Sequence, residues 1–412
     1  MRSVFTIFIF ISVVTEAEIQ FNVNTYLSAQ RNEISDSYIN LNNQVLKLPT
    51  YELDFDFRPD LKWIYAVNKI VLRPTFEWRY SKSEINQMSQ NTTKNKLQLT
   101  DAFVETNWNP LFSSTLGLQV YQWGPAEFLS PSNPLFHFNS AQRGLSYKEK
   151  GQVLIRGNIS LDQENNLVFV LQPISNQESE WKYQSDFSPK VFLKYEKSWL
   201  EKNHYIGLVS GIEETNKFFL AQYFNYFLTE GFSVYADLKQ TKKQTHYTPV
   251  FDGNGYNMEQ VNPESDEVKT LGIFGFRYES NFDVRLEYIY NQAGYNSNHL
   301  KSAIQSASNF LTPNYTVNLQ RFLRPGLELL GQHYFYSSLR ILEPFDQANF
   351  TVYGRVLVSG QDSSTQLQTE VDYGFLDSWS GFVSLSHSFG SQNTELNLLN
   401  RASAFVGIKN SF

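Results

Sequence analysis

The chain has 412 residues and no cysteine, which excludes disulfide scaffolds, thiolate metal sites and cysteine nucleophiles. A hydrophobic content of 41% and a mean hydropathy of -0.38 are too polar for a multi-helix membrane protein. The formal net charge is -7 with no block of like charges, so a nucleic-acid partner is excluded as well.

The first residues have the pattern of a secretory signal peptide. Arg2 precedes an apolar run from Val4 to Val14, and Thr15 and Ala17 occupy the small-residue positions before a cleavage site. The run is short for a bilayer-spanning helix, so we expect cleavage after Ala17, with a retained membrane anchor as the alternative. The signal peptide is then residues 1–17. Residues 18–412 show no linker or composition break and are expected to form a single domain.

Alternation of apolar and polar residues at period two continues through the rest of the chain. In the clearest case, Phe282, Leu286 and Tyr290 share one face, and Asp283 and Glu287 lie on the opposite face. The same pattern occurs at 51–58, 76–80, 350–358 and 366–375. These segments predict β-strands with one apolar and one charged face.

Strand length and aromatic placement distinguish a membrane barrel from a soluble sandwich. The alternating segments run about nine to twelve residues, as tilted membrane-crossing strands do. Aromatic residues crowd the segment ends, at Trp63 to Tyr65, Trp78 to Tyr80, Trp199 and Trp379. Such aromatics form girdles at the two membrane surfaces. We therefore predict an all-β fold, a transmembrane antiparallel up-and-down β-barrel.

The connections between predicted strands fall into two classes. Turns are short at 201–203, 229–230 and 281, whereas 82–95, 124–150, 240–267 and 292–312 read as long loops, the last with a short helix at Lys301 to Phe310. Outer-membrane barrels have short periplasmic turns and long external loops. The sequence yields nineteen candidate strands. Because an even number is expected, the best estimate is about eighteen, with sixteen as the alternative.

If the apolar faces meet lipid, the charged faces point into the lumen, since charge on the lipid face near the midplane costs about 2 to 4 kcal/mol. A barrel of this size is too wide for side chains to fill, which favours a water-filled pore; pairing of these charges across a narrow lumen is the alternative. The predicted pore-lining residues are Asp54, Asp56, Glu77, Arg79, Arg156, Arg277, Asp283, Arg285, Glu287 and Arg355.

The C-terminus has apolar residues alternating back from a terminal Phe412. It resembles the closing strand of bacterial outer-membrane proteins, whose terminal aromatic residue is recognised by the barrel-assembly machinery. Asn410 departs from the aromatic or apolar residue usual at that position. The resemblance implies that Phe412 is an assembly signal and that the barrel-assembly machinery is a partner.

A second resemblance covers Leu97 to Pro134. Gly117, Gln119, Trp123 and Gly124 form a Gly-x-Gln-x-x-x-Trp-Gly pattern followed by a Pro-rich stretch. This resembles porin-like outer-membrane families, and the resemblance implies a diffusion channel in the bacterial outer membrane. Such families often trimerise, so a homotrimer is an open possibility.

The Pro-rich stretch is stiff, and glycine permits a close approach or a bend. We therefore predict that 124–150 folds into the barrel and narrows it, with Arg143, Lys148 or Lys150 near the solute path. An external loop that closes over the rim is the alternative.

The sequence therefore predicts a porin-like channel for passive diffusion of small hydrophilic solutes, without metal or organic cofactor. The six histidines do not show the pairing with serine and an orienting partner that a hydrolase needs, so we expect no enzyme. A non-conducting barrel acting as adhesin, receptor or scaffold is the first alternative, and a secreted sandwich that binds carbohydrate is the second. Outer-membrane lipids and lipopolysaccharide are expected partners, the latter through Lys239, Lys242 and Lys243.

Overall fold

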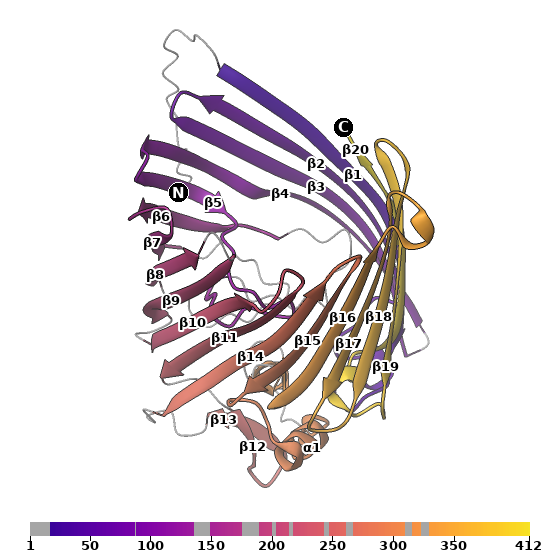
Figure 1. Cartoon of the computed structure of the whole chain (residues 1–412). Helices are drawn as coiled ribbons and strands as arrows, with labels where there is room; N and C mark the ends of the chain where they lie inside the picture. The colour runs from indigo at the N-terminus through magenta and orange to yellow at the C-terminus, as the bar shows by residue number, and fades with distance from the viewer. Residues whose placement is uncertain are drawn as a thin grey trace, which may run out of the picture.

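The structure is a computed structural model that describes residues 17–86, 88–135, 149–174, 189–199, 203–213, 217–242, 247–260, 267–309, 315–322 and 329–412. Within these ranges, eighteen strands form one antiparallel sheet (Figure 1). They are β1 (Ala17–Ile34), β2 (Tyr51–Tyr65), β3 (Asn68–Ile85), β4 (Met88–Asn109), β5 (Phe112–Gln119), β6 (Gln152–Ser160), β7 (Asn165–Gln172), β8 (Lys190–Trp199), β9 (His204–Glu213), β10 (Lys217–Phe227), β11 (Phe232–Lys242), β14 (Val268–Glu279), β15 (Phe282–Asn291), β16 (His333–Leu342), β17 (Phe350–Ser359), β18 (Thr365–Leu376), β19 (Trp379–Phe389) and β20 (Asn400–Ser411).

The sheet closes on itself because β1 pairs with both β2 and β20. Every other strand of the barrel pairs with its sequence neighbours, and at the seam the backbone N–H of Val23 donates to the Phe412 carbonyl at 3.0 Å. The Phe412 N–H returns a bond to the Val23 carbonyl at 2.9 Å. The barrel therefore has no open sheet edge along this seam, and the estimate of eighteen strands in up-and-down order is confirmed, whereas sixteen is wrong.

Register places apolar residues on the outer surface and charged residues on the inner one. On β14 and β15, Phe276 and Leu286 are paired on one face and are 52% and 51% exposed. Arg277 and Arg285, one position along in each strand, are paired on the other face. Exposed apolar side chains of this size are unfavourable in water, so the outer surface fits a hydrocarbon environment.

The two ends of the barrel differ. The turn end carries the short connections, such as 66–67, 110–111 and 280–281, together with the start of β1 and the end of β20. The opposite end, the loop end, carries the connections at 35–50, 243–267, 292–332 and 390–399.

The predicted long loop at 82–95 is wrong, because β3 continues to Ile85 and β4 starts at Met88. The Ser, Thr, Asn and Lys residues of this segment are typical of a loop, because both faces of the two strands are polar here. The ladder between the two strands nevertheless runs unbroken from Tyr80 and Thr93 to the tip. This polar ribbon, which continues past the first residue of β2, lacks the apolar face by which strands are recognised in sequence.

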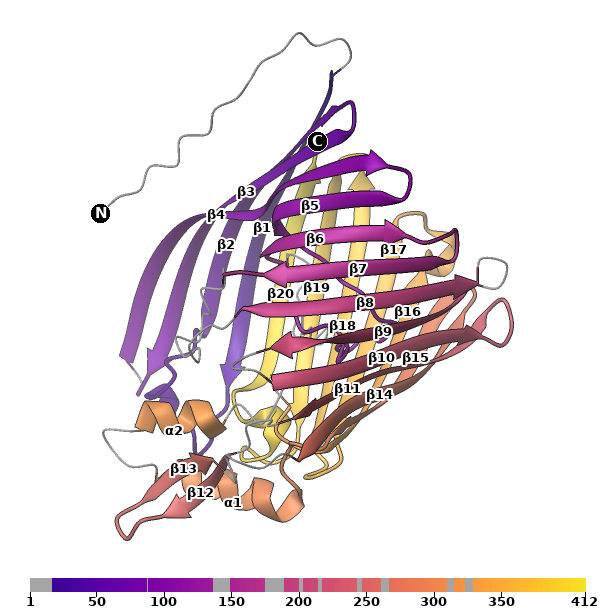
Figure 2. The same cartoon turned by 90° about the vertical axis from the view of Figure 1, so that its left-hand side faces the viewer.

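At the loop end, long connections pack against each other to form a cap (Figure 2). It consists of the hairpin of β12 (Tyr247–Phe251) and β13 (Tyr256–Gln260), α1 (Ser297–Ala307), α2 (Tyr315–Phe322) and neighbouring connections. None of the helices in the described ranges is long and apolar enough to span a bilayer. The buried core of the cap is Ile39, Met258, Tyr295, Leu300, Ala303, Ile304, Ala307, Leu319, Phe322, Leu330 and Leu398.

The predicted helix at Lys301 to Phe310 is present but is shifted towards the N-terminus, as α1. The Asn296 side chain accepts a hydrogen bond from the His299 N–H at 3.0 Å and so caps the helix at that point. The position of the N-cap residue Asn296 therefore determines where α1 begins, which the apolar pattern alone did not indicate.

A buried carboxylate joins three connections of the loop end. The Glu395 side chain accepts hydrogen bonds from the Leu330 N–H at 2.6 Å and the Tyr334 hydroxyl at 2.5 Å. Its own backbone N–H donates to Asp362 at 2.6 Å, and the Ser359 hydroxyl lies 3.3 Å from its second oxygen. Burial raises the pKa of Glu395 to about 7, since the hydrogen bonds it accepts offset only part of the desolvation and Asp362 adds repulsion.

Raising the pH from about 5 to about 8 is therefore expected to loosen the cap. Between the unfolded pKa of about 4.3 and the folded value, the folded side chain keeps a proton that the unfolded one has lost. Stability thus falls as pH rises through this window, by an amount on the order of 3 kcal/mol, and levels off above the folded pKa. Hydrogen exchange of cap peptides in the folded barrel measures this. The Glu395→Gln variant should lose the pH dependence, and an identical slope in the variant would contradict the assignment.

Candidate functional site: the lumen and its in-folded segment

The connection between β5 and β6 turns into the barrel, and we call residues 120–135 the in-folded segment (Figure 1). The backbone N–H groups of Glu127 and Phe128 donate to the Glu287 carboxylate on β15, at 2.6 and 3.1 Å. That strand lies far from β5 and β6 around the barrel. The predicted entry of this connection into the lumen is therefore seen in its first part. Residues 136–148, which include Arg143 and Lys148, lie outside the described residues.

A second carboxylate of the wall holds the segment further along. The Asp237 side chain on β11 accepts hydrogen bonds from the Ser132 N–H at 2.6 Å and from the Ser130 hydroxyl at 2.9 Å. Both Asp237 and Glu287 are buried, and neither forms an ion pair within the described residues. Hydrogen bonds to a carboxylate are stronger than neutral ones, so these two side chains fix the path of the segment.

The segment in turn supplies a carboxylate to the wall. The Glu127 side chain accepts from the Tyr336 hydroxyl at 2.8 Å and the Ser338 hydroxyl at 2.9 Å, both on β16. Its second oxygen also lies 3.2 Å from Nε of Arg285. Hydrogen bonds therefore join the segment and the wall in both directions, with carboxylate acceptors on the wall and on the segment.

Apolar contacts cover the rest of the segment's wall-facing side. Trp123 and Leu135 pack in one buried cluster with Leu154, Phe192 and Phe219, which project inward from β6, β8 and β10. Phe128 and Leu129 pack in another cluster, with the wall residues Leu271, Ile273, Ile289, Tyr334, Tyr336 and Leu357. The segment therefore occupies the side of the lumen formed by β6 to β17.

Two glycines of the Gly-x-Gln-x-x-x-Trp-Gly pattern allow this path. Gly117 has φ of +122°, and a Cβ there would lie 2.3 Å from the Ala102 carbonyl oxygen. Gly124 has φ of +97°, and a Cβ there would lie 2.3 Å from Oδ2 of Asp237. The predicted reason for both residues, a close approach or a bend, fits this geometry. Trp123 of the same pattern is buried against Phe192, with ring centroids 5.6 Å apart.

The opposite side of the lumen carries predicted charges that are paired locally. On β2 and β3, Arg79 lies 2.8 Å from Asp54 and 2.9 Å from Glu77. Asp56 lies 2.5 Å from Arg58 of the same strand. On β17 and β18, Arg355 pairs with Glu370. These residues lie on the faces opposite to the exposed apolar side chains of the same strands.

The remaining predicted residues lie on β6, β14 and β15. Arg277 pairs with Asp283 at 2.9 Å, and Asp283 lies 3.5 Å from Arg285. Arg156 on β6 donates to the Thr115 hydroxyl at 2.9 Å, and its guanidinium lies 4.6 Å from the centre of the Tyr121 ring. Within the described ranges, Arg156 forms no ion pair with a carboxylate. Lys150 is half-buried at the end of the connection.

Sequence reasoning missed the residues that hold the segment, namely Glu127, Tyr235, Asp237 and Tyr336. A signal existed for Asp237, because Tyr235, Asp237 and Lys239 alternate with Val234 and Leu238. The Tyr235 hydroxyl donates to Glu287 at 2.8 Å, across Gly275 of β14, and so supports one anchor from the same inner face. No sequence pattern links these residues to a connection more than a hundred positions earlier.

The predicted contact of Lys239 with lipopolysaccharide is wrong. Its ammonium lies 5.2 Å from the centre of the Phe219 ring, and the side chain is buried on the inner face of β11. Strand parity places it beside Asp237 and Thr241, on the face opposite to lipid. Lys242 is exposed, and Lys243 lies outside the described residues.

Comparison with known proteins gives matches at the level of the fold. No protein-family model matches the sequence, and no curated protein matches it either. Acinetobacter baumannii OccAB1 is similar in structure, with 9% identity, 96% of each chain covered and a TM-score of 0.58. Pseudomonas aeruginosa OccK7 (OpdD) has 10% identity, coverage of 97% of this chain and 99% of the other, and a TM-score of 0.57. Pseudomonas aeruginosa OprD has 8% identity, coverage of 96% and 95%, and a TM-score of 0.55. These similarities span nearly the whole barrel.

Proposed function

We propose that this chain is a porin-like channel of the bacterial outer membrane, through which small hydrophilic solutes diffuse passively. The observation that carries the proposal is a closed barrel of eighteen strands, apolar outside and charged inside, with a segment packed against one side of its lumen. The structures it resembles are OprD/Occ outer-membrane porins, which are channels and carry out no catalysis. We assign no enzymatic step and no cofactor to the chain.

The exterior supports a membrane location. On β1, outward-facing apolar residues extend from Ile19 through Phe21 to Leu27. Together with Ala29, they cover about 25 Å along the barrel axis for strands tilted by about 40°. This is the height of the apolar band of outer-membrane barrels. The turn end with the termini is then periplasmic and the cap is external.

The solute path runs along the side that the in-folded segment leaves free. There the inner faces of β18 to β20 and of β1 to β4 carry mainly hydroxyl, amide and charged side chains. They include Asn32, Asp54, Asp56, Arg58, Glu77, Arg79, Gln368, Glu370 and Ser386. Rows of paired acids and bases select solutes by charge and size without binding them tightly.

Reconstitution of the folded chain in a planar bilayer tests the function. Stepwise conductance is expected from single insertions. A correctly folded barrel without conductance would support the alternative, a non-conducting adhesin, receptor or scaffold, for which the packed cap is the favourable observation. A freely soluble protein that does not insert into the bilayer would contradict both the channel and the non-conducting membrane barrel.

Neutralising Arg79 and Arg355 together is expected to raise the cation-to-anion permeability ratio roughly twofold. Each substitution by glutamine leaves carboxylates of the free wall uncompensated, namely Asp54 and Glu77 beside Arg79, and Glu370 beside Arg355. Reversal potentials in a salt gradient measure the ratio. Arg401→Gln is the matched control, because Arg401 is exposed and pairs with Glu33 at the loop-end start of β20. An unchanged reversal potential would exclude both arginines from the path.

Assembly follows from the chain ends. We propose that residues 1–17 are removed as a signal peptide, which shortens β1 by Ala17 alone. Phe412, whose side chain is 75% exposed at the end of β20, is the assembly signal for the barrel-assembly machinery. Because one chain closes the barrel, and because OprD/Occ porins are monomeric, a monomer is the simplest functional unit. A homotrimer would appear as triple conductance steps.

A further inference from the structure

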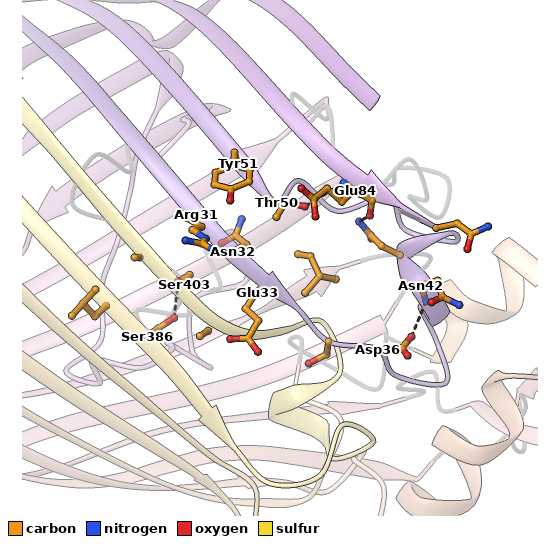
Figure 3. Close-up of a pocket in the computed structure, with 17 residues that line it drawn as sticks. Arg31, Asn32, Glu33, Asp36, Asn42, Thr50, Tyr51, Glu84, Ser386 and Ser403 are labelled. Atoms are coloured by element: carbon orange, nitrogen blue, oxygen red, sulfur yellow. Dashed lines mark hydrogen bonds between the residues drawn. The ribbon is translucent and has the colours of Figure 1, made fainter. Parts of the chain in front are cut away.

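One row of outward-facing residues at the loop end combines two cations with an aromatic ring. Strand register pairs Arg31 with Tyr51 and Tyr51 with Lys82, on β1, β2 and β3. The Arg31 guanidinium lies 5.5 Å from the centre of the Tyr51 ring, and the Lys82 ammonium lies 5.6 Å from the same centre. Figure 3 shows Arg31 and Tyr51 next to each other, with Glu33 further along β1.

This row lies directly beyond the apolar band. Towards the turn end, the next outward positions are Ala29 on β1, Leu53 on β2 and Tyr80 on β3. Leu53 is 37% exposed, as expected for a residue in contact with lipid tails. Towards the cap, the outward positions become charged, at Glu33 and Glu84. The row is therefore at the level where the headgroups of the outer leaflet begin.

The same register row continues into small and apolar residues. Arg31 is paired with Ala404 of β20, and Ala404 is paired with Leu385 of β19. A hollow of about 760 Å³ at this level is lined by Arg31, Tyr51, Leu385, Ala402 and Ala404 of the outer row together with the inward-facing Asn32, Ser386 and Ser403 (Figure 3). One part of this row is cationic and the other is apolar.

The positive charge of the row is available. Within the described residues, Arg31 forms no ion pair and is exposed. Lys82 lies 3.5 Å from Glu84, and Glu33 lies 3.4 Å from Arg401, but all four side chains are at least one-third exposed. Such pairs contribute little and exchange readily with other anions.

We propose that Arg31 and Lys82 bind a phosphate of lipopolysaccharide, with Tyr51 between them and with the lipid's acyl chains against Ala404 and Leu385. The guanidinium fork suits two phosphate oxygens, and the ammonium adds a point charge. Tyrosine fits this level because its ring is apolar and its hydroxyl is polar. The proposal rests on the outer-membrane location proposed above, but it is independent of conductance. It also replaces Lys239 as the lipopolysaccharide contact.

Native mass spectrometry of the full folded chain with hexa-acylated lipid A tests the proposal. The double variant Arg31→Gln with Lys82→Gln is expected to bind lipid A about thirtyfold more weakly, since each basic side chain near an anionic lipid contributes about fivefold. The double variant Lys47→Gln with Lys301→Gln removes the same charge from exposed cap positions and should bind as the unchanged chain does.

Two further measurements identify the ligand. Dephosphorylated lipid A should bind the unchanged chain as weakly as phosphorylated lipid A binds the double variant. Inorganic phosphate at millimolar concentration should not displace lipid A; if it does, the row is a general anion site and the lipid assignment is overturned. Equal lipid A affinity in the double variant and the unchanged chain would also overturn it. The double variant should conduct as the unchanged chain does. An unchanged chain that binds lipid A but does not conduct would contradict the proposed channel and leave the lipid A site in place.

Discussion

Replacing Asp237 and Glu287 together by alanine is expected to roughly double the single-channel conductance and to make the open current noisier. The two carboxylates accept hydrogen bonds from four groups of the in-folded segment, the N–H groups of Glu127, Phe128 and Ser132 and the hydroxyl of Ser130. Removing an acceptor from a buried donor costs about 1 to 3 kcal/mol for each donor. The apolar clusters around Trp123 and Phe128 remain, but they have no directional bonds to hold the segment in one position.

Single-channel recording in planar bilayers measures this effect, and circular dichroism confirms that the variant is folded. Asp372→Ala is the matched control, because Asp372 is also a carboxylate on the inner-face parity of its strand. It forms no hydrogen bond to the in-folded segment within the described residues. If the double variant conducts like the control, the two carboxylates do not position the segment.

The substitution Gly117→Val is expected to prevent folding of the barrel. The backbone of Gly117 has φ of +122°, which costs a β-branched residue on the order of 1 to 3 kcal/mol. The added Cβ would also meet the Ala102 carbonyl oxygen at 2.3 Å and Cα of Phe103 at 2.9 Å. Both are backbone atoms of β4, so relief of the clash would separate β4 from β5 at the place where the chain turns into the lumen.

Gly354→Val provides a matched control for this change. Gly354 lies on β17 with no atom within 4 Å of its added Cβ and with an ordinary backbone conformation. The yield of the folded form, measured by its altered migration in unheated gel samples, should be near zero for Gly117→Val and unchanged for Gly354→Val. A normal folded yield for Gly117→Val would show that the close approach between β4 and β5 is not required.

Period-two alternation, together with the expectation of an even strand number, was enough to predict the barrel, its eighteen strands and the inward side of the charges on β15. In β15, the exposed Phe282 and Leu286 and the inward Asp283 and Glu287 follow directly from parity, because register fixes a whole strand once one face is assigned. The glycines and prolines after β5 likewise predicted an irregular connection that enters the lumen. Both predictions depend on local chemistry.

Three features of the structure were missed or misplaced by the sequence predictions. Glu287 lies on the inner face as parity predicts, but no sequence pattern indicated the hydrogen bonds that it accepts from Glu127 and Phe128, about 160 positions earlier. Lys239 was assigned to the lipid surface because its strand end was placed at the rim, whereas parity with Asp237 places it inside. The ribbon at 82–95 was predicted to be a loop because its two polar faces hide the strand signal. Only the first case depends on a distant partner; the other two depend on parity within β11 and on the pairing of β3 with β4.

Because β1 pairs with β20, the barrel can close only after both strands have been synthesised. Val23 and Phe412 exchange backbone hydrogen bonds, and β1 pairs with β20 over most of its length, so β1 has no neighbour on that side until β20 has been synthesised. A chain that ends before β20 would have two unpaired sheet edges, which can pair with strands of other chains and cause aggregation. We therefore expect a truncated chain to be degraded by proteases before it can insert as an incompletely closed barrel.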